Sequence, residues 1–236
     1  MEDLRVRMEV AAEAAWEAGR VTLAYFQARF EVERKADLTP VTIADREAER
    51  RLVEELSSRF PDDGILGEEH GERPGRSGYR WVVDPIDGTK SFIHGVPLYA
   101  VLVGLEDPTG EAVVGAACLP ALGELIVAAR GEGCWWNSRR ARVSSVDRLS
   151  DACVLATGEE CFELAGAEPV WKEISAQAGL VRGWGDAYGH LLVATGRAEA
   201  MVDPVLADWD CVALAPIVDE AGGVFTDWKG QRTVRG

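Results

Sequence analysis

The sequence lacks several features that would assign it to a broad protein class. No window of about 18 consecutive apolar residues occurs, so no membrane-spanning helix is expected. The five cysteines form no Cys-x-x-Cys pair, and their odd number and irregular spacing favour buried reduced thiols over disulfides or zinc ligands. The charged amino-terminal residues are unlike a secretion signal. We therefore expect a soluble, cytoplasmic protein with no membrane partner.

Basic residues are also scarce, with 25 Lys and Arg against 40 Asp and Glu, which gives a net charge of −15. A generic nucleic-acid-binding protein would have the opposite balance, so no nucleic-acid partner is expected. Only three histidines are present, in unrelated contexts, and no histidine metal site is indicated. A nucleophile elbow or a Cys-His signature is likewise missing.

What is present is enough apolar sequence for a sizeable core, at 47% of 236 residues. We expect two lobes of one compact unit: an α+β lobe over residues 1–140 and an α/β lobe over residues 141–236. Apolar periodicity predicts a helix at residues 3–30, with one buried stripe formed by Leu4, Met8, Ala11, Ala12, Ala15 and Trp16. A turn at residues 36–40 and a capping box from Thr42 to Asp45 precede a second helix that ends near Phe60. Further helices are predicted at residues 169–178, 187–195 and 208–221. The apolar pattern predicts strands at residues 64–68, 79–84, 99–106, 112–119, 124–129, 153–156, 180–182, 198–202 and 224–226, of which the middle group would form an antiparallel meander.

The most informative segment is Trp81-Val-Val-Asp84-Pro-Ile86-Asp87-Gly88-Thr89, in which an apolar run ends in two aspartates before a helix start. Carboxylates hold Mg²⁺, and the free backbone amides at a helix start hold phosphate oxygens. The same residues are also common turn formers and helix caps. Taken alone, the segment is equally consistent with a turn and with a metal-assisted phosphate site.

Three further acidic positions add to this segment. Glu68, followed by Glu69, ends a short apolar strand, so two neighbouring strands ending in acids would place carboxylates side by side. A bound divalent cation would remove their repulsion, whereas the alternative is a pair of solvated loop acids. Asp45 and Asp210 each stand in the first turn of an expected helix, where an acid is also explained as a cap.

Together these segments resemble the inositol monophosphatase superfamily of Mg²⁺-dependent, lithium-sensitive phosphatases, over nearly the whole chain. The resemblance rests on Gly67-Glu68-Glu69, on Asp84 to Thr89, and on Trp209-Asp210-x-x-Ala213 leading to Glu220-Ala-Gly-Gly223. It implies a layered αβαβα sandwich and a homodimer. It implies that Glu68, Asp84, the carbonyl of Ile86, Asp87 and Asp210 bind metal, that Asp45 serves a third ion, that Thr89 and Glu68 help to activate water, and that the amides of Gly88 and Thr89 contact phosphate.

The chemistry of the reaction agrees with these roles. A phosphate monoester dianion repels an attacking hydroxide, and two or three Mg²⁺ ions would neutralise the ester, acidify a water and stabilise the leaving alkoxide. Bound cations also explain how an acidic protein could bind an anionic substrate, because they become the largest local charges.

Within the superfamily, the sequence is most similar to the histidinol-phosphate phosphatases. That likeness rests on the segments 37–45 and 61–71, on Lys90 after Gly-Thr, and on Gly185-Asp186 before a helix. It implies a substrate contact at Asp186, with the adjoining Ala187, and a substrate-binding acid at Asp203. Histidinol phosphate carries an ammonium and a protonatable imidazole, which these acids would complement. The alternatives are a helix cap for Asp186 and a turn acid for Asp203.

The sequence departs from that branch in three respects. Asp203 stands where the family has a longer glutamate, and Tyr188 and His190 stand where larger aromatics are frequent. The family also continues by about a strand and a short helix beyond Gly236, so the chain is either a short member or lacks that edge. Other readings are an inositol-1-monophosphatase, a 3′-phosphoadenosine nucleotide phosphatase, or a non-catalytic interaction protein on the same fold, with Trp135 and Trp136 at an interface.

Overall fold

The computed structural model describes residues 4–29, 31–34 and 40–235. The helices are α1 (Leu4–Leu23), α2 (Ile43–Arg59), α3 (Thr89–Ile93), α4 (Glu159–Leu164), α5 (Glu168–Gln177), α6 (Asp186–Ala194) and α7 (Asp208–Glu220). The strands are β1 (Glu33–Arg34), β2 (Pro40–Val41), β3 (Gly64–Gly67), β4 (Gly71–Arg73), β5 (Arg80–Asp87), β6 (Ala100–Glu106), β7 (Ala112–Leu119), β8 (Glu124–Ala129), β9 (Gly133–Trp136), β10 (Arg139–Arg140), β11 (Cys153–Leu155), β12 (Leu180–Arg182) and β13 (Ala200–Met201).

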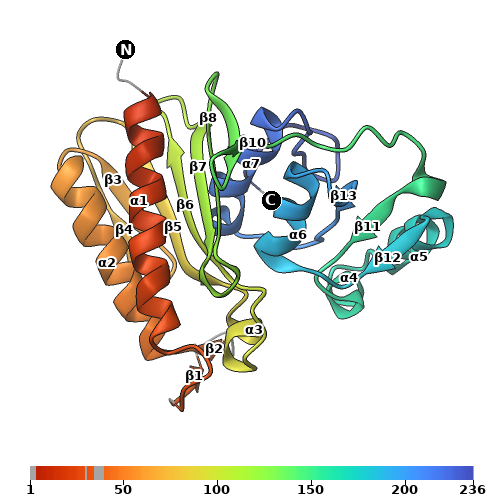
Figure 1. Cartoon of the computed structure of the whole chain (residues 1–236), viewed down its shortest axis with the longest axis horizontal. Helices are drawn as coiled ribbons and strands as arrows, with labels where there is room; N and C mark the ends of the chain where they lie inside the picture. The colour runs from red at the N-terminus through yellow and green to blue at the C-terminus, as the bar shows by residue number, and fades with distance from the viewer. Residues whose placement is uncertain (1–3, 30, 35–39, 236) are drawn as a thin grey trace.

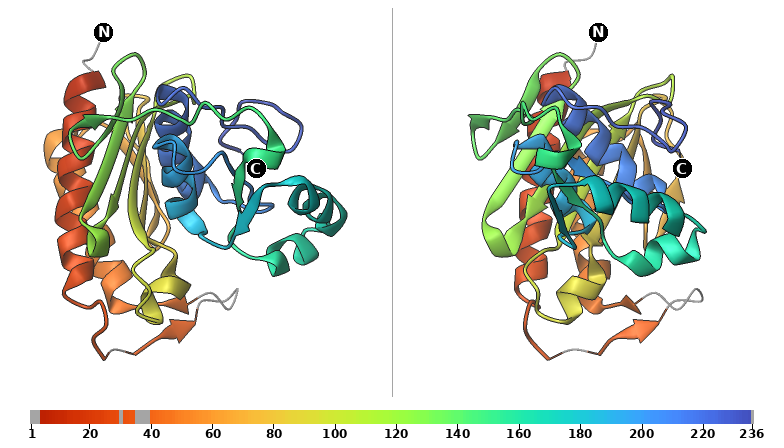
Figure 2. Two further views of the ribbon diagram at one scale, coloured as in Figure 1. Left: turned by 45° about the vertical axis from the view of Figure 1, so that its right-hand side comes forward. Right: turned by 90° about the vertical axis from the view of Figure 1, so that its right-hand side faces the viewer.

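These elements stack as five alternating layers (Figures 1 and 2). Helices α1 and α2 cover one face of the large sheet, and α6 and α7 cover its other face. The small sheet, in the order β12-β11-β13, lies beyond α6 and α7, and α4 and α5 close the far side. This order confirms the αβαβα sandwich.

The large sheet has the strand order β10-β9-β8-β7-β6-β5-β3-β4. Its strands from β5 to β10 form the expected antiparallel meander, and the bounds of β7 and β8 match those predicted. The exception to antiparallel pairing is β3, which runs parallel to β5 with Gly67 opposite Val83. Because parallel strands end at the same edge of a sheet, the residues that follow β3 meet those at the end of β5.

Helix α7 lies unusually close to the large sheet. A Cβ atom added to Gly115 would lie 1.9 Å from the carbonyl oxygen of Ala213, and one added to Gly104 would lie 2.7 Å from the Ala213 nitrogen. Glycine at these two strand positions therefore lets the helix backbone rest on the strands themselves. This contact fixes where the amino-terminal turn of α7 lies relative to β5.

The first helix is shorter than predicted, and its buried face, which includes Met8, Ala11 and Ala15 as predicted, does not include Trp16. It ends at Leu23 because the next residues turn away: Phe26 packs against Phe92 and Tyr99, and Gln27 has a φ of 60°. Trp16, expected on the buried stripe, is 44% exposed, since the face toward the sheet carries small residues that allow close packing. The buried face is formed by Met8, Val10, Ala11, Ala14, Ala15 and Ala18. Residues 3, 30 and 36–39, at the ends of this prediction and in the turn expected next, lie outside the described residues.

The strand predicted at residues 224–226 is wrong. Phe225 donates its amide to a carboxylate oxygen of Asp219 at 3.4 Å, and Asp227 pairs with Gln231, so the segment follows α7 as an irregular turn instead of joining a sheet. Helix α4 and strands β4, β9 and β10 were not predicted, because they are short and polar or begin at glycine and so show little periodicity.

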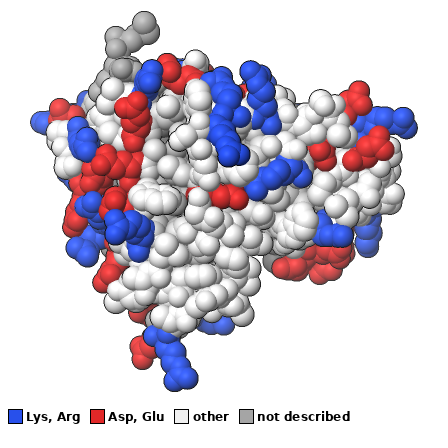
Figure 3. Space-filling view, in the orientation of Figure 1, with Lys and Arg blue, Asp and Glu red and all other residues white. Residues whose placement is uncertain are grey.

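Many of the acidic residues lie on the outer helices, where they form ion pairs with arginine. Figure 3 shows acidic and basic side chains interspersed on the side formed by α1 and α2, where ion pairs join Arg59 to Glu13 and Arg50 to Glu54. No helix in the described part of the chain is both long and apolar enough to cross a membrane. All five cysteines are free thiols, as predicted.

Candidate active site

The parallel pairing of β3 and β5 brings the first two predicted acids together. Glu68 follows the last residue of β3 and donates its amide to the carbonyl of Val83 at 3.3 Å, directly beside Asp84. The side chain of Asp84 is buried, and one of its oxygens accepts the amide of Ile86 at 2.9 Å. Two acids on neighbouring strands are thus held against one edge of the sheet.

Asp87 lies next to this pair because β5 is irregular between Asp84 and Asp87. Gly88 then takes the left-handed conformation, with a φ of 82°, and starts α3. The hydroxyl of Thr89 turns back to donate to the carbonyl of Ile86 at 3.0 Å. The resulting turn gathers the Asp87 carboxylate, the Ile86 carbonyl and the start of α3 at one point.

Asp210, which joins Glu68, Asp84 and Asp87, comes from the other half of the chain. Asp210 stands in the first turn of α7, where it accepts the amide of Ala207 at 2.7 Å. Carboxylate oxygens of Asp84, Asp87 and Asp210 all lie within 4.8 Å of one another, a spacing that a single metal ion can bridge. The structure therefore assembles three of the predicted metal ligands.

Asp45 takes part in the capping box at the start of α2, which is the alternative role predicted for it. One of its oxygens accepts both the amide of Thr42 at 2.8 Å and the hydroxyl of Thr42 at 2.6 Å, which completes a capping box. Its other oxygen is buried and has no hydrogen-bond partner among the residues that the structure describes. A buried carboxylate oxygen without a donor is costly, and a cation would satisfy it.

The four aspartates share one arrangement: each gives one oxygen to a backbone amide of its surroundings. Asp45 accepts from Thr42, Asp84 from Ile86, Asp87 from Ala187 at 2.6 Å, and Asp210 from Ala207. These bonds orient the carboxylates without consuming the second oxygen. The backbone thus orients all four carboxylates, and those of Asp84, Asp87 and Asp210 lie close together.

Burial and mutual repulsion make this cluster reluctant to ionise. Burial, and then the charges of Glu68, Asp87 and Asp210, raise the pKa of Asp84 well above its ordinary value. Burial, followed by the charges of Asp186 and Asp210, does the same to the pKa of Asp87. Burial raises the pKa of Asp210 to about 6, and burial with the nearby charge of Glu68 also raises the pKa of Asp45. Divalent cations would compensate this concentration of negative charge.

The two predicted substrate acids lie beside the cluster, on the second lobe. Asp186 is the first residue of α6 and has a φ of 52°, so it is not the cap residue of that helix, a position that Gly185 holds. Burial, and then the charge of Asp203, raises the pKa of Asp186 to about 6. The amide of Ala187 is bonded to Asp87, so it links α6 to the cluster instead of being open to a ligand.

Sequence reasoning missed Glu49, because its neighbours in the chain are mostly charged and it therefore reads as a surface residue of α2. Its carboxylate is buried and accepts the amides of Glu69 and His70 at 2.8 and 2.9 Å. It thereby fixes the turn that carries Glu68. His190, left as an ordinary histidine, and Thr157 were also missed, and both contact Asp203.

We expect Glu49→Gln to lower kcat/KM by roughly tenfold or more and to raise the Mg²⁺ concentration needed for half-maximal activity, because glutamine can accept only one of the two amides. Glu54→Gln, at an exposed position of the same helix, is the matched control. Titration of activity with Mg²⁺ measures the effect, and equal curves for the two variants would contradict it.

Comparison with known proteins agrees with this geometry. The model of the inositol monophosphatase family matches residues 3–235. The chain belongs to the inositol monophosphatase family. It is similar to a histidinol-phosphatase of Chlorobaculum parvum, with 48% identity over 96% of this chain and 88% of the relative. It is also similar to an inositol-1-monophosphatase of Rhizobium meliloti, with 37% identity over 94% of this chain and 86% of that protein.

Among solved structures, the extragenic suppressor protein SuhB of Bartonella henselae superposes with a TM-score of 0.88, at 33% identity over 97% of this chain and 90% of that one. The family consists of metal-dependent phosphatases that act on small phosphate esters. The chain is accordingly a phosphoric monoester hydrolase.

Proposed function

We propose that the protein hydrolyses L-histidinol phosphate to L-histidinol and phosphate, with two or three Mg²⁺ ions. The observation that carries the proposal is the clustering of acids of two kinds: Asp84, Asp87 and Asp210 within reach of one ion, and Asp186 beside them on the second lobe. Hard carboxylate and carbonyl oxygens are the ligands that Mg²⁺ prefers over softer donors.

Under this proposal, each residue of the site has one task. Metal would be held by Glu68, Asp84, the Ile86 carbonyl, Asp87 and Asp210, with Asp45 at a further ion. When bound, Mg²⁺ would neutralise the ester dianion and acidify a water. Glu68 and Thr89 would orient the attacking water, and the Glu68 carboxylate would take its proton. The amides of Gly88 and Thr89 would donate to phosphate oxygens. Hydrolysis by water needs no nucleophilic side chain.

The substrate assignment rests on the acids of the second lobe. Histidinol phosphate carries an ammonium next to its phosphate-bearing carbon, and Asp186 and Asp203 would each accept a charge-assisted hydrogen bond from such a cation. The histidinol-phosphatase name of the 48%-identical relative supports the same substrate. The second candidate is inositol-1-phosphate, favoured by the name of the relative from Rhizobium meliloti.

We expect phosphate release from L-histidinol phosphate to exceed that from inositol-1-phosphate by at least about tenfold in kcat/KM, as the loss of one charge-assisted hydrogen bond would give. A panel with both esters and 3′-phosphoadenosine nucleotides, with and without Mg²⁺, measures this. Equal rates on the first two esters would rule out the histidinol assignment. Activity unaffected by a chelator would rule out the metal.

We also infer, from the resemblance to the family, that the protein is a cytoplasmic homodimer inhibited by lithium. Sedimentation of the purified protein tests the dimer, and phosphate release at rising LiCl concentration, with NaCl as the control, tests the inhibition.

A further inference from the structure

The carboxylate of Asp203 is held on both of its oxygens. One oxygen accepts the amide of Thr157 at 3.1 Å, and the other faces the Nε2 atom of His190 at 3.6 Å. That second oxygen and the Nε2 atom are both buried, and neither has a hydrogen-bond partner among the described residues. At 3.6 Å the contact is electrostatic, and together with the bond from Thr157 it fixes the orientation of the carboxylate.

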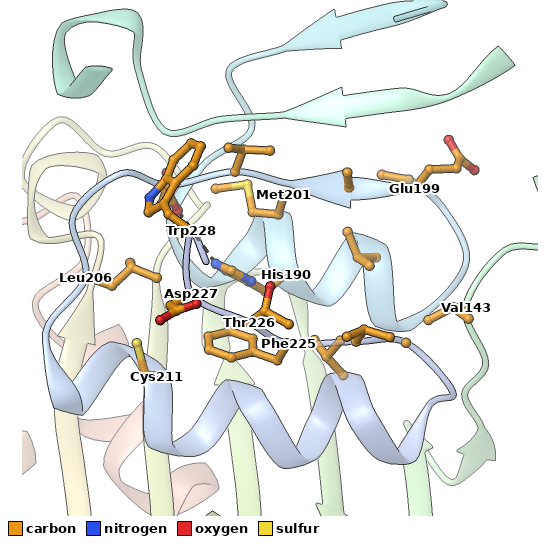
Figure 4. Close-up of a pocket in the computed structure, with 18 of the residues that line it drawn as sticks. Val143, His190, Glu199, Met201, Leu206, Cys211, Phe225, Thr226, Asp227 and Trp228 are labelled. Carbon is orange, nitrogen blue, oxygen red and sulfur yellow. Dashed lines mark ion pairs between the residues drawn. The ribbon is translucent and has the colours of Figure 1, made fainter. Parts of the chain in front are cut away.

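His190, on α6, and Asp203 both line a cavity of about 710 Å³ between β13 and α7 (Figure 4). The imidazole lies near Phe225, with 5.8 Å between ring centroids, and Met201 lines the same cavity. These contacts limit the rotation of the ring. Its nitrogen is the polar group that faces Asp203 from this side.

Thr157 links Asp203 to the other substrate acid. Its amide donates to Asp203, and its hydroxyl accepts the amide of Asp186 at 3.0 Å. The charge of Asp203 also contributes to the raised pKa of Asp186. A single residue in the loop after β11 thus sets the spacing of both acids.

We propose that His190 is a positioning residue for substrates that carry an ammonium group, because, together with Thr157, it holds the carboxylate of Asp203 in one orientation beside Asp186. This inference rests on the proposed function. It adds the residue that makes the pair Asp186 and Asp203 selective for a substrate with an ammonium group. Without the imidazole, Asp203 would be tied only through Thr157 and its carboxylate could rotate. An ammonium would then meet one ordered acceptor instead of two.

The test compares esters that differ only in the ammonium group. L-Histidinol phosphate is paired with its desamino analogue, and phosphoethanolamine is paired with ethyl phosphate. The ratio of kcat/KM within each pair is the amine preference. We expect the wild-type preference to exceed one and His190→Leu to reduce it by about tenfold, mainly through KM for the amine ester, as for one weakened charge-assisted hydrogen bond.

Two further variants separate positioning from packing. His190→Gln keeps a donor near Asp203 and should restore most of the preference, whereas Met201→Leu changes the wall of the same cavity without a polar group and should leave the preference unchanged. A merely structural role for His190 would reduce both esters of a pair together. Thermal unfolding confirms that each variant is folded.

The inference is overturned if the wild type shows no amine preference in either pair, or if His190→Leu keeps the wild-type ratio. The proposed substrate alone would be refuted if inositol-1-phosphate were hydrolysed as fast as histidinol phosphate. The inference would still stand in that case if His190→Leu reduced the preference for phosphoethanolamine over ethyl phosphate.

Discussion

Asp84→Asn is expected to abolish phosphate release and, at the same time, to make the metal-free protein more stable. Asparagine keeps a side-chain oxygen that can accept the Ile86 amide, so the turn after β5 is preserved. It removes one charge from a buried cluster whose acids repel one another. Loss of a residue outside the coordination sphere costs roughly 10–100-fold in activity, so loss of a ligand should exceed about 100-fold.

Two measurements check this result. Phosphate release gives the activity, and thermal unfolding in chelator gives the stability, where a gain of about 1 kcal/mol would raise Tm by about 2–4 °C in a chain of this size. Addition of Mg²⁺ should raise Tm of the wild type and have little effect on the variant. Asp151→Asn, at an exposed acid, is the control. Wild-type activity in Asp84→Asn would eliminate the metal site.

The metal-free protein is expected to lose stability as pH rises from about 4 to about 7, the reverse of the usual acid behaviour of proteins. The pKa values of Asp186 and Asp210 are raised by burial to about 6, above the ordinary value of 3.8. Between these values the folded state binds more protons than the unfolded state, so the free energy of unfolding falls with pH. Each carboxyl accounts for on the order of 3 kcal/mol, fully present below pH 4 and lost through pH 6.

Thermal unfolding in chelator from pH 4.5 to 8 would measure this slope, and the same series in Mg²⁺ should recover the stability lost at the upper end, since ions replace the protons. Asp210→Asn keeps an acceptor for the Ala207 amide and should flatten the metal-free slope. A metal-free stability that rises between pH 4.5 and pH 7 would contradict the expectation.

Part of the site follows from local sequence, and part does not. The proximity of Glu68 and Asp84 could be derived from residues alone, because both follow short apolar strands and neighbouring strands bring their ends together. The arrival of Asp210 at the same point could not, because it depends on α7 resting on Gly104 and Gly115, some 100 residues earlier in the chain. Its placement came from the resemblance to a family.

The same limit explains the residues that were missed. Glu49 and His190 show their roles only through partners that are distant in the chain, the turn after β3 and Asp203 respectively. The errors in the fold have a local cause: Val224 to Thr226 is apolar enough for a strand, but Phe225 bonds to Asp219. Apolar periodicity reports the secondary-structure preference of a segment and carries no information about the residues that lie next to it in the folded protein.

The sharing of each aspartate between a backbone amide and the centre of the cluster has an evolutionary consequence. A descendant that had lost hydrolysis would still benefit from Asp45 and Asp210, because each accepts the backbone amide of the residue that precedes the first turn of its helix, Thr42 for α2 and Ala207 for α7. The presence of these two acids in a related sequence therefore indicates that the fold is kept, and does not by itself indicate that the protein hydrolyses phosphate esters. Glu68 follows β3 and lies at no helix start. Its presence or absence therefore distinguishes an active enzyme from an inactive relative better than that of the two aspartates.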